Sequence, residues 1–169
     1  MNMLTPVKLR DEASSFRDPF LEHRLQQEAQ HLAQVASADD PIHSLVTVEF
    51  NITELCNRKC VFCPRVNPEV YPNRNLNMSI DVVRKVANDL KEAESAARLS
   101  FSGFGEALLH KEFEDILRTI SQILPSNSLE ANTNGDRLTT EKINSLFDAG
   151  LTSLYVNLYD GPHQVEHFN

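Results

Sequence analysis

Short apolar segments alternate with helix-like segments from about residue 44 onward. Four short segments are rich in β-branched, aromatic or other apolar residues, and this composition predicts strands. The predicted strands are 46–52, 98–102, 129–133 and 153–158. Each of the first three is followed by a segment in which apolar residues recur at the 3.6-residue spacing of an amphipathic helix.

End signals delimit the three predicted helices. Ser79 is the expected N-cap of the first helix, Pro125 follows the second, and Thr139 and Gly150 bracket the third. The expected buried faces of the first two helices are Val82, Val83, Val86 and Leu90, and Phe113, Ile116, Leu117, Ile120 and Leu124. Strands and helices that alternate in this way favour parallel pairing with right-handed crossovers.

The predicted fold class is therefore α/β, with residues 43–169 forming part of a (βα) barrel. Only about three and a half βα units are present, so we expect a longer barrel whose missing half lies in further sequence or in a partner chain. Residues 1–42 are predicted to be a helical extension, in which Leu21, Leu25, Leu32 and Val35 recur at helical spacing.

Composition narrows the class of protein. The chain has 169 residues, 41% of them hydrophobic and 24% charged, which is typical of a globular domain. Its net charge of −8 argues against nucleic acid and anionic membranes as partners. No apolar run approaches the roughly 20 residues of a membrane span, and the amino terminus lacks the apolar core of a secretory signal. We therefore expect a cytoplasmic protein.

All three cysteines of the chain lie in one eight-residue window, CNRKCVFC, directly after the first predicted strand. Cys56, Cys60 and Cys63 thus have C-x3-C-x2-C spacing, which allows three thiolates to bind three irons of a [4Fe–4S] cluster and leaves the fourth iron open. The basic residues Arg58, Lys59 and Arg65 are expected to place positive charge beside such a cluster.

Other chemistries remain open from these residues alone. A structural zinc site would need a fourth ligand such as His43 or His110, a conventional ferredoxin cluster would need a fourth cysteine, and a dithiol pair would leave Cys56 unused. Residues 163–167 also fit H-x-x-E-H, the inverted zinc-protease motif. A module that binds iron–sulfur or zinc without catalysis is the alternative from a non-enzyme class.

The segment ITELCNRKCVFCPR resembles the cysteine signature of radical S-adenosylmethionine (radical SAM) enzymes, with Phe62 at its aromatic position. The resemblance covers roughly residues 44–169, the amino-terminal part of that family's partial (βα)6 barrel. Further segments match in order: SGFGE after the second strand, TNG after the third and VNLYDGP after the fourth. The last segment is similar to members that often carry an additional cluster domain called SPASM.

This resemblance implies roles for particular residues. Cys56, Cys60 and Cys63 would bind the cluster. Glu106, with Gly103 and Gly105, would hold the methionine end of S-adenosylmethionine, and Phe62, Asn134 and Asn157 would lie near the cofactor. SGFGE departs from the family's G-G-E-P, because Phe104 separates the glycines and Ala107 replaces proline. Asn134 also suits a simple turn, and Asn157 suits a helix cap.

The implied function is that of a radical SAM enzyme, or of its cofactor-binding fragment. The cluster would reduce S-adenosylmethionine to a 5′-deoxyadenosyl radical, which would abstract hydrogen from a small-molecule, sugar or peptide substrate. The resemblance also implies a reductant such as flavodoxin or ferredoxin. The long segment 64–78 is expected to cover the cluster.

Overall fold

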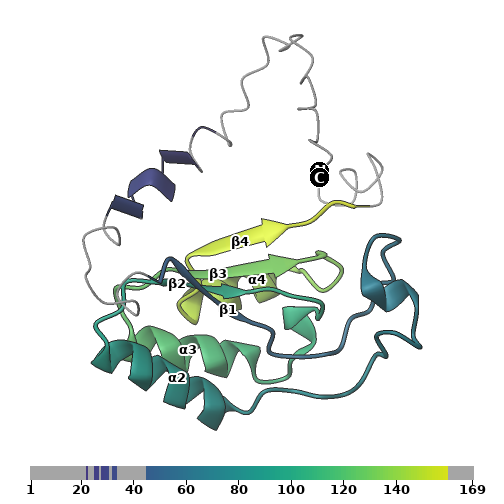
Figure 1. Ribbon diagram of the computed structural model, residues 1–169, viewed down its shortest axis with the longest axis horizontal. Helices are drawn as coiled ribbons and strands as arrows, with labels where there is room; N and C mark the ends of the chain where they lie inside the picture. Colours follow the sequence, from purple (N-terminus) through teal and green to yellow (C-terminus); the bar gives the residue numbers. More distant parts are fainter. Residues whose placement is uncertain (1–21, 23–24, 27, 31, 34–44, 160–169) are drawn as a thin grey trace, which may run out of the picture.

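The computed structural model describes residues 22, 25–26, 28–30, 32–33 and 45–159, which contain one four-stranded sheet (Figure 1). All neighbouring strands pair in parallel, in the order β1-β2-β3-β4. The strands are β1 (Thr47–Phe50), β2 (Arg98–Phe101), β3 (Leu129–Thr133) and β4 (Ser153–Val156). This arrangement confirms the predicted α/β class and its parallel strands, with three βα units and a fourth strand.

Three helices connect the strands: α2 (Ile80–Glu92), α3 (Phe113–Ile123) and α4 (Thr140–Asp148). Ser79 and Thr139 cap α2 and α4 as predicted, because their hydroxyl oxygens accept hydrogen bonds from backbone N–H groups of the first turn. Two short 3-10 helices, η1 (Pro64–Val66) and η2 (Ala107–Leu109), lie in the loops after β1 and β2. Among the described residues, no helix is long and apolar enough to cross a membrane.

A single hydrophobic core lies between the sheet and the three helices, which cover one face of the sheet (Figure 1). The predicted apolar face of α3 is entirely buried. On α2 the buried face is rotated slightly from the prediction, because Val83, Ala87 and Leu90 are buried while Val82 is 49% exposed. Adjacent residues of a helix point in different directions, so Val82 faces solvent while Val83 faces the core.

The described residues between 22 and 33 are helical, in line with the predicted amphipathic segment. Leu25 and Leu32 are exposed, at 59% and 45%, so these two leucines do not pack into the core. Glu28 instead forms an ion pair of 3.0 Å with Arg98 at the start of β2. The division at residue 42 stays a prediction, because most of residues 1–44, including His43, lie outside the described residues.

Gly150 generates the first prediction, because it ends α4 with φ +107° and packs closely on α3. A Cβ atom at this position would lie 2.5 Å from the Cβ of Ser121. We expect Gly150→Ala to lower the free energy of unfolding by about 2 kcal/mol, through both backbone strain and steric overlap. Denaturant unfolding measures the change.

Asn144→Ala, an exposed substitution on α4, is the matched control and should change stability by less than about 0.5 kcal/mol. Equal stability of Gly150→Ala and the unmodified chain would contradict the structural role assigned to this glycine.

Candidate functional site

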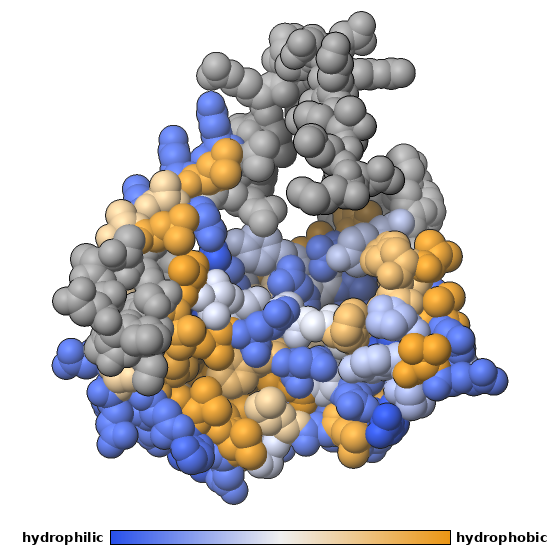
Figure 2. Space-filling view, in the orientation of Figure 1, coloured by the Kyte–Doolittle hydropathy of each residue, from blue (hydrophilic) through white to orange (hydrophobic). Residues whose placement is uncertain are grey.

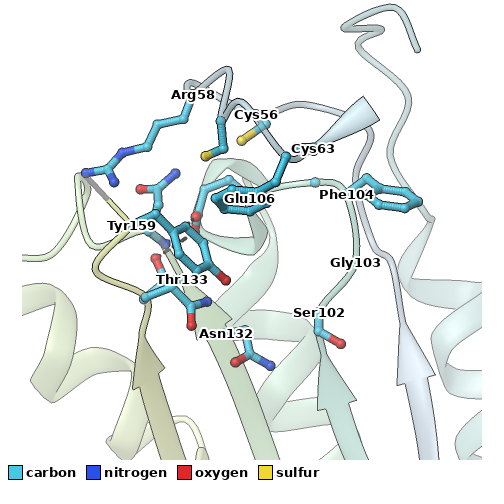
Figure 3. A pocket seen from close by; sticks show the side chains of 15 residues that line it. Cys56, Arg58, Cys63, Ser102, Gly103, Phe104, Glu106, Asn132, Thr133 and Tyr159 are labelled. Atoms are coloured by element: carbon cyan, nitrogen blue, oxygen red, sulfur yellow. Dashed lines mark hydrogen bonds between the residues drawn. The ribbon is translucent and has the colours of Figure 1, made fainter. Parts of the chain in front are cut away.

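The carboxyl ends of the four strands surround one pocket, with a cavity volume of about 240 Å³ (Figure 3). In parallel sheets the loops at these ends meet at one edge, which is where ligands bind in α/β folds. Every site residue predicted from the sequence lines this pocket: Cys56, Cys60, Phe62, Cys63, Gly103, Gly105, Glu106, Asn134 and Asn157. Their chemical roles stay predictions, but their convergence on one cavity is a feature of the fold.

The three cysteine side chains are partly exposed on the loop that follows β1, and they form no disulfide among the described residues. A turn joins two of them, since the Cys63 N–H donates to the Cys60 carbonyl at 2.9 Å. The Cys56 N–H donates to Oδ1 of Asn73 at 2.9 Å. Asn73 belongs to the 64–78 segment, so that segment returns beside the cysteine loop and supports it.

Arg65 joins three loops of the site and is itself buried, with 4% exposure. Its guanidinium donates to the backbone carbonyls of Glu54 and Phe104 and to the side-chain oxygen of Asn73. The same group lies over the ring of Tyr71, 4.7 Å from its centroid. Arg65 therefore connects the cysteine loop, the loop after β2 and the 64–78 segment, which is a different role from the cluster-facing charge expected from sequence.

A second polar network joins the cysteine loop to the turn after β3. Arg58 and Asn57 both donate to the carboxylate of Asp136, and the Asn134 amide donates to Asn57 at 2.9 Å. The Asp136 N–H donates a hydrogen bond to the side-chain oxygen of Asn134 at 3.0 Å. Asn134 is thus bonded within the chain through both ends of its amide group.

Glu106 is a buried carboxylate, 3% exposed, held by three hydrogen-bond donors of the chain. Its Oε1 accepts from the Thr133 hydroxyl at 2.8 Å and from the Leu108 N–H at 3.2 Å, and its Oε2 accepts from the Asn134 N–H at 2.8 Å. A carboxylate can accept about four hydrogen bonds, so Oε2 retains capacity for a further donor from a ligand.

Gly105 allows the loop after β2 to contact the segment that joins β1 to the cysteine loop. A Cβ atom at Gly105 would lie 1.8 Å from the Thr53 carbonyl oxygen, so no other residue fits without moving backbone. The next residue makes the contact, because the Glu106 N–H donates to the Leu55 carbonyl at 2.7 Å. This glycine serves the approach of two protein loops, in addition to any space it leaves for a ligand.

Aromatic and aliphatic side chains border the cysteine side of the pocket. The Phe62 and Tyr159 rings pack edge to face, with centroids 4.8 Å apart, and both side chains are largely exposed. Val61 is 87% exposed. Apolar surface is visible over this loop region at the right of Figure 2, so the cysteine loop presents apolar groups as well as thiols to its surroundings.

The described residues give no support to zinc bound by the cysteines and His110, whereas His43 lies outside them. His110 is buried, and its Nδ1 accepts from the Glu112 N–H at 3.2 Å while its Nε2 contacts the Met78 carbonyl at 3.0 Å. Across the described part of the chain, no three His, Cys, Asp or Glu side chains converge on a single-ion site. A [4Fe–4S] cluster needs no such convergence, since each thiolate binds a different iron. Residues 163–167, the protease-like motif, lie outside the described residues.

Six further residues line the pocket: Arg58, Ser102, Phe104, Asn132, Thr133 and Tyr159. Of these, only Arg58 has a role predicted from the sequence, as a positive charge beside the cluster. Alternation along β2 and β3 would have indicated Ser102 and Asn132, because it places them on the face opposite the apolar residues. Tyr159 follows β4 in irregular backbone, so only its place in the VNLYDGP segment could have indicated it.

Comparison with known proteins identifies the family. The sequence profile of the Radical SAM superfamily matches residues 50–166. The S-adenosyl-L-methionine-dependent 2-deoxy-scyllo-inosamine dehydrogenase of Niallia circulans is 28% identical over 122 residues, covering 72% of this chain and 47% of that protein. The GTP 3′,8-cyclase of Pectobacterium atrosepticum is 30% identical over 115 residues, covering 66% of this chain and 33% of that protein.

Solved structures show the same fold. The crystal structure of BtrN in complex with AdoMet and 2-DOIA matches with a TM-score of 0.64 at 24% identity, covering 70% of this chain and 47% of that one. BtrN in an open conformation matches with a TM-score of 0.61 and covers 75% of this chain.

The chain belongs to the radical SAM superfamily, a class of enzymes that use a [4Fe–4S] cluster and S-adenosylmethionine. The predicted family, enzyme class and cofactor pair are thereby confirmed at the level of the superfamily. The chain spans half or less of the length of the two curated relatives named above.

The three-loop role of Arg65 can be tested by substitution. Replacement by alanine leaves two backbone carbonyls and the Asn73 oxygen without their donor, so we expect Arg65→Ala to lower the free energy of unfolding by about 2–4 kcal/mol. Arg65→Lys should recover only part of this loss, since an ammonium cannot reproduce the planar fork. Denaturant unfolding of the protein without iron measures both changes.

The control is Arg84→Ala, which removes an exposed arginine whose ion pair among the described residues is with Asp81 on α2, and it should cost less than about 0.5 kcal/mol. Similar effects of the two alanine variants would argue against the three-loop role of Arg65.

Proposed function

We propose that this chain binds the cluster and S-adenosylmethionine of a radical SAM enzyme that abstracts hydrogen from a small-molecule substrate. The observation that carries the proposal is the convergence of three cysteine side chains and a buried carboxylate on one pocket. Clustered cysteines that form no disulfide also suit a reducing compartment, so we place the protein in the cytoplasm.

Cys56, Cys60 and Cys63 would each bind one iron through a thiolate. The donor set fits, because the chain offers three sulfur ligands on one loop and the chemistry requires one iron without a protein ligand. When bound, the cluster supplies one electron that cleaves S-adenosylmethionine and produces the radical used for hydrogen abstraction. The Cys56 N–H and the Arg65 guanidinium both donate to the side-chain oxygen of Asn73, and these bonds would keep the loop in a conformation ready to bind iron.

Glu106 would accept a hydrogen bond from the amino group of S-adenosylmethionine. Its three donors within the chain fix the carboxylate before the ligand arrives, so little conformational entropy is lost on binding. Phe62 and Asn157 would lie beside the nucleoside, and we add Tyr159 to this group because its ring packs on Phe62. Asn134, whose side chain is bonded to the cysteine loop, would contribute mainly by orienting Glu106 through its backbone N–H.

Two kinds of partner follow from the same proposal. A one-electron carrier such as flavodoxin or ferredoxin would reduce the cluster. Further strands, from the same protein or from a partner chain, would pair with β4, which has β3 on one side and no strand on the other among the described residues. The reaction product stays open, because the two curated relatives are a dehydrogenase and a cyclase.

The cysteines provide the direct test. After anaerobic reconstitution with iron and sulfide, we expect the unmodified chain to hold about four irons. Each of Cys56→Ser, Cys60→Ser and Cys63→Ser should lose most of the iron and the low-temperature paramagnetic signal of the reduced cluster. Metal analysis and electron paramagnetic resonance measure these outcomes.

Val61→Ser is the matched control, because it changes an exposed side chain of the same loop and leaves all three thiols in place. Full iron content in the three cysteine variants would refute the proposed ligand set. Formation of 5′-deoxyadenosine from S-adenosylmethionine then separates an enzyme from a module that binds the cluster without catalysis.

Glu106→Gln tests the proposed contact to the amino group. The amide is nearly the same size but neutral, so we expect the affinity for S-adenosylmethionine to fall about tenfold, as measured by calorimetry on the reconstituted protein. Glu69→Gln removes an exposed carboxylate from the neighbouring 64–78 segment and should leave that affinity unchanged. Equal affinity of Glu106→Gln and the unmodified protein would remove Glu106 from the proposed site.

A further inference from the structure

The face of the sheet opposite the three helices is polar. Strand register aligns one row across all four strands, consisting of Glu49, Ser100, Glu130 and Ser153. The next row, Phe50, Phe101, Ala131 and Leu154, packs with the helices in the core. Successive residues of a strand point to opposite faces of the sheet. The first row therefore lies on the face opposite α2, α3 and α4.

Glu49 is the exposed carboxylate of this row at the β1 edge. A short chain of hydroxyl groups orients it: Ser100 donates to Ser102 at 3.3 Å, and Ser102 donates to the Glu49 carboxylate. The nearby cation Arg98 pairs instead with Glu28 at 3.0 Å and with Glu130 at 4.0 Å. Among the described residues, no cationic side chain pairs with Glu49.

Glu49 also adjoins the pocket of the candidate site. Ser102, its hydrogen-bond partner, lines that pocket and lies with Asn132 at the strand ends below Glu106 (Figure 3). Glu49 and Asn51 line a neighbouring hollow, which shares Gly103 and Phe104 with the pocket. A molecule in this hollow would therefore lie next to any ligand that occupies the pocket.

We propose that Glu49, oriented by Ser102, binds a protonated amine on a small, hydroxyl-bearing substrate, an inference that rests on the proposed radical SAM function. A carboxylate that has no cationic partner in the part of the chain that the structure describes gains most from a ligand that brings both a positive charge and N–H donors. The serine and asparagine side chains nearby suit hydroxyl groups, which both donate and accept. An anionic substrate would be repelled by Glu49 and Glu130, which share this face.

The test compares three related probes on the chain reconstituted anaerobically with its cluster and S-adenosylmethionine. The probes are glucosamine, which carries a protonated amine under mildly acidic conditions, and its uncharged counterparts glucose and N-acetylglucosamine. We expect glucosamine to bind about tenfold more tightly than glucose, the effect of one charge-assisted hydrogen bond. Ligand-observed nuclear magnetic resonance measures the three affinities.

Glu49→Gln should abolish the preference for the amine, since the amide keeps its size but loses its charge. Glu92→Gln removes the same charge from the exposed end of α2, on the helix side of the sheet, and should retain the full preference. Thermal unfolding of Glu49→Gln checks that the variant is folded.

Equal affinity for the three probes, or a preference that persists in Glu49→Gln, would overturn the assignment of Glu49. The cluster signal and the binding of S-adenosylmethionine are measured on the same sample. Their loss would count against the proposed function, whereas their presence without an amine preference would count against this inference alone.

Discussion

The site depends on the contact between two backbone segments, at Gly105 and Thr53. Because glycine has no Cβ atom, the loop after β2 can lie against the segment that joins β1 to the cysteine loop, and the Glu106 N–H then donates to the Leu55 carbonyl. This contact places the buried carboxylate of Glu106 beside the cysteines. Arg65 holds the same two segments together, because it donates to the carbonyls of Glu54 and Phe104.

The carboxylate of Glu106 illustrates how a charge is kept in the interior without an ion pair. Burial of a carboxylate is costly unless hydrogen bonds replace the lost water, and here one hydroxyl and two backbone N–H groups do so. Two of these donors, Thr133 and the N–H of Asn134, come from the end of β3. The position of Glu106 therefore depends on the pairing of β2 with β3, which aligns the ends of these strands.

The two faces of the sheet have opposite chemistry, and each has a separate purpose. One face carries the apolar rows that pack against α2, α3 and α4 and stabilise the fold. The other carries Glu49, Ser100 and Glu130 and continues into the pocket through Ser102. Polar groups on this face do not pack in the core, and they are the groups to which we assign recognition of a polar ligand.

The sequence by itself determined the strand and helix order, the caps at Ser79 and Thr139, and the meeting of the predicted site residues in one pocket. Those features depend on local spacing, and parallel strands necessarily bring their carboxyl ends to one edge. Tertiary structure decided which partners complete the site: Asn73 and Arg65 at the cysteine loop, Thr133 at Glu106, and Ser102 at Glu49. These contacts join residues distant in sequence through irregular loops, and no periodic pattern encodes the path of such loops.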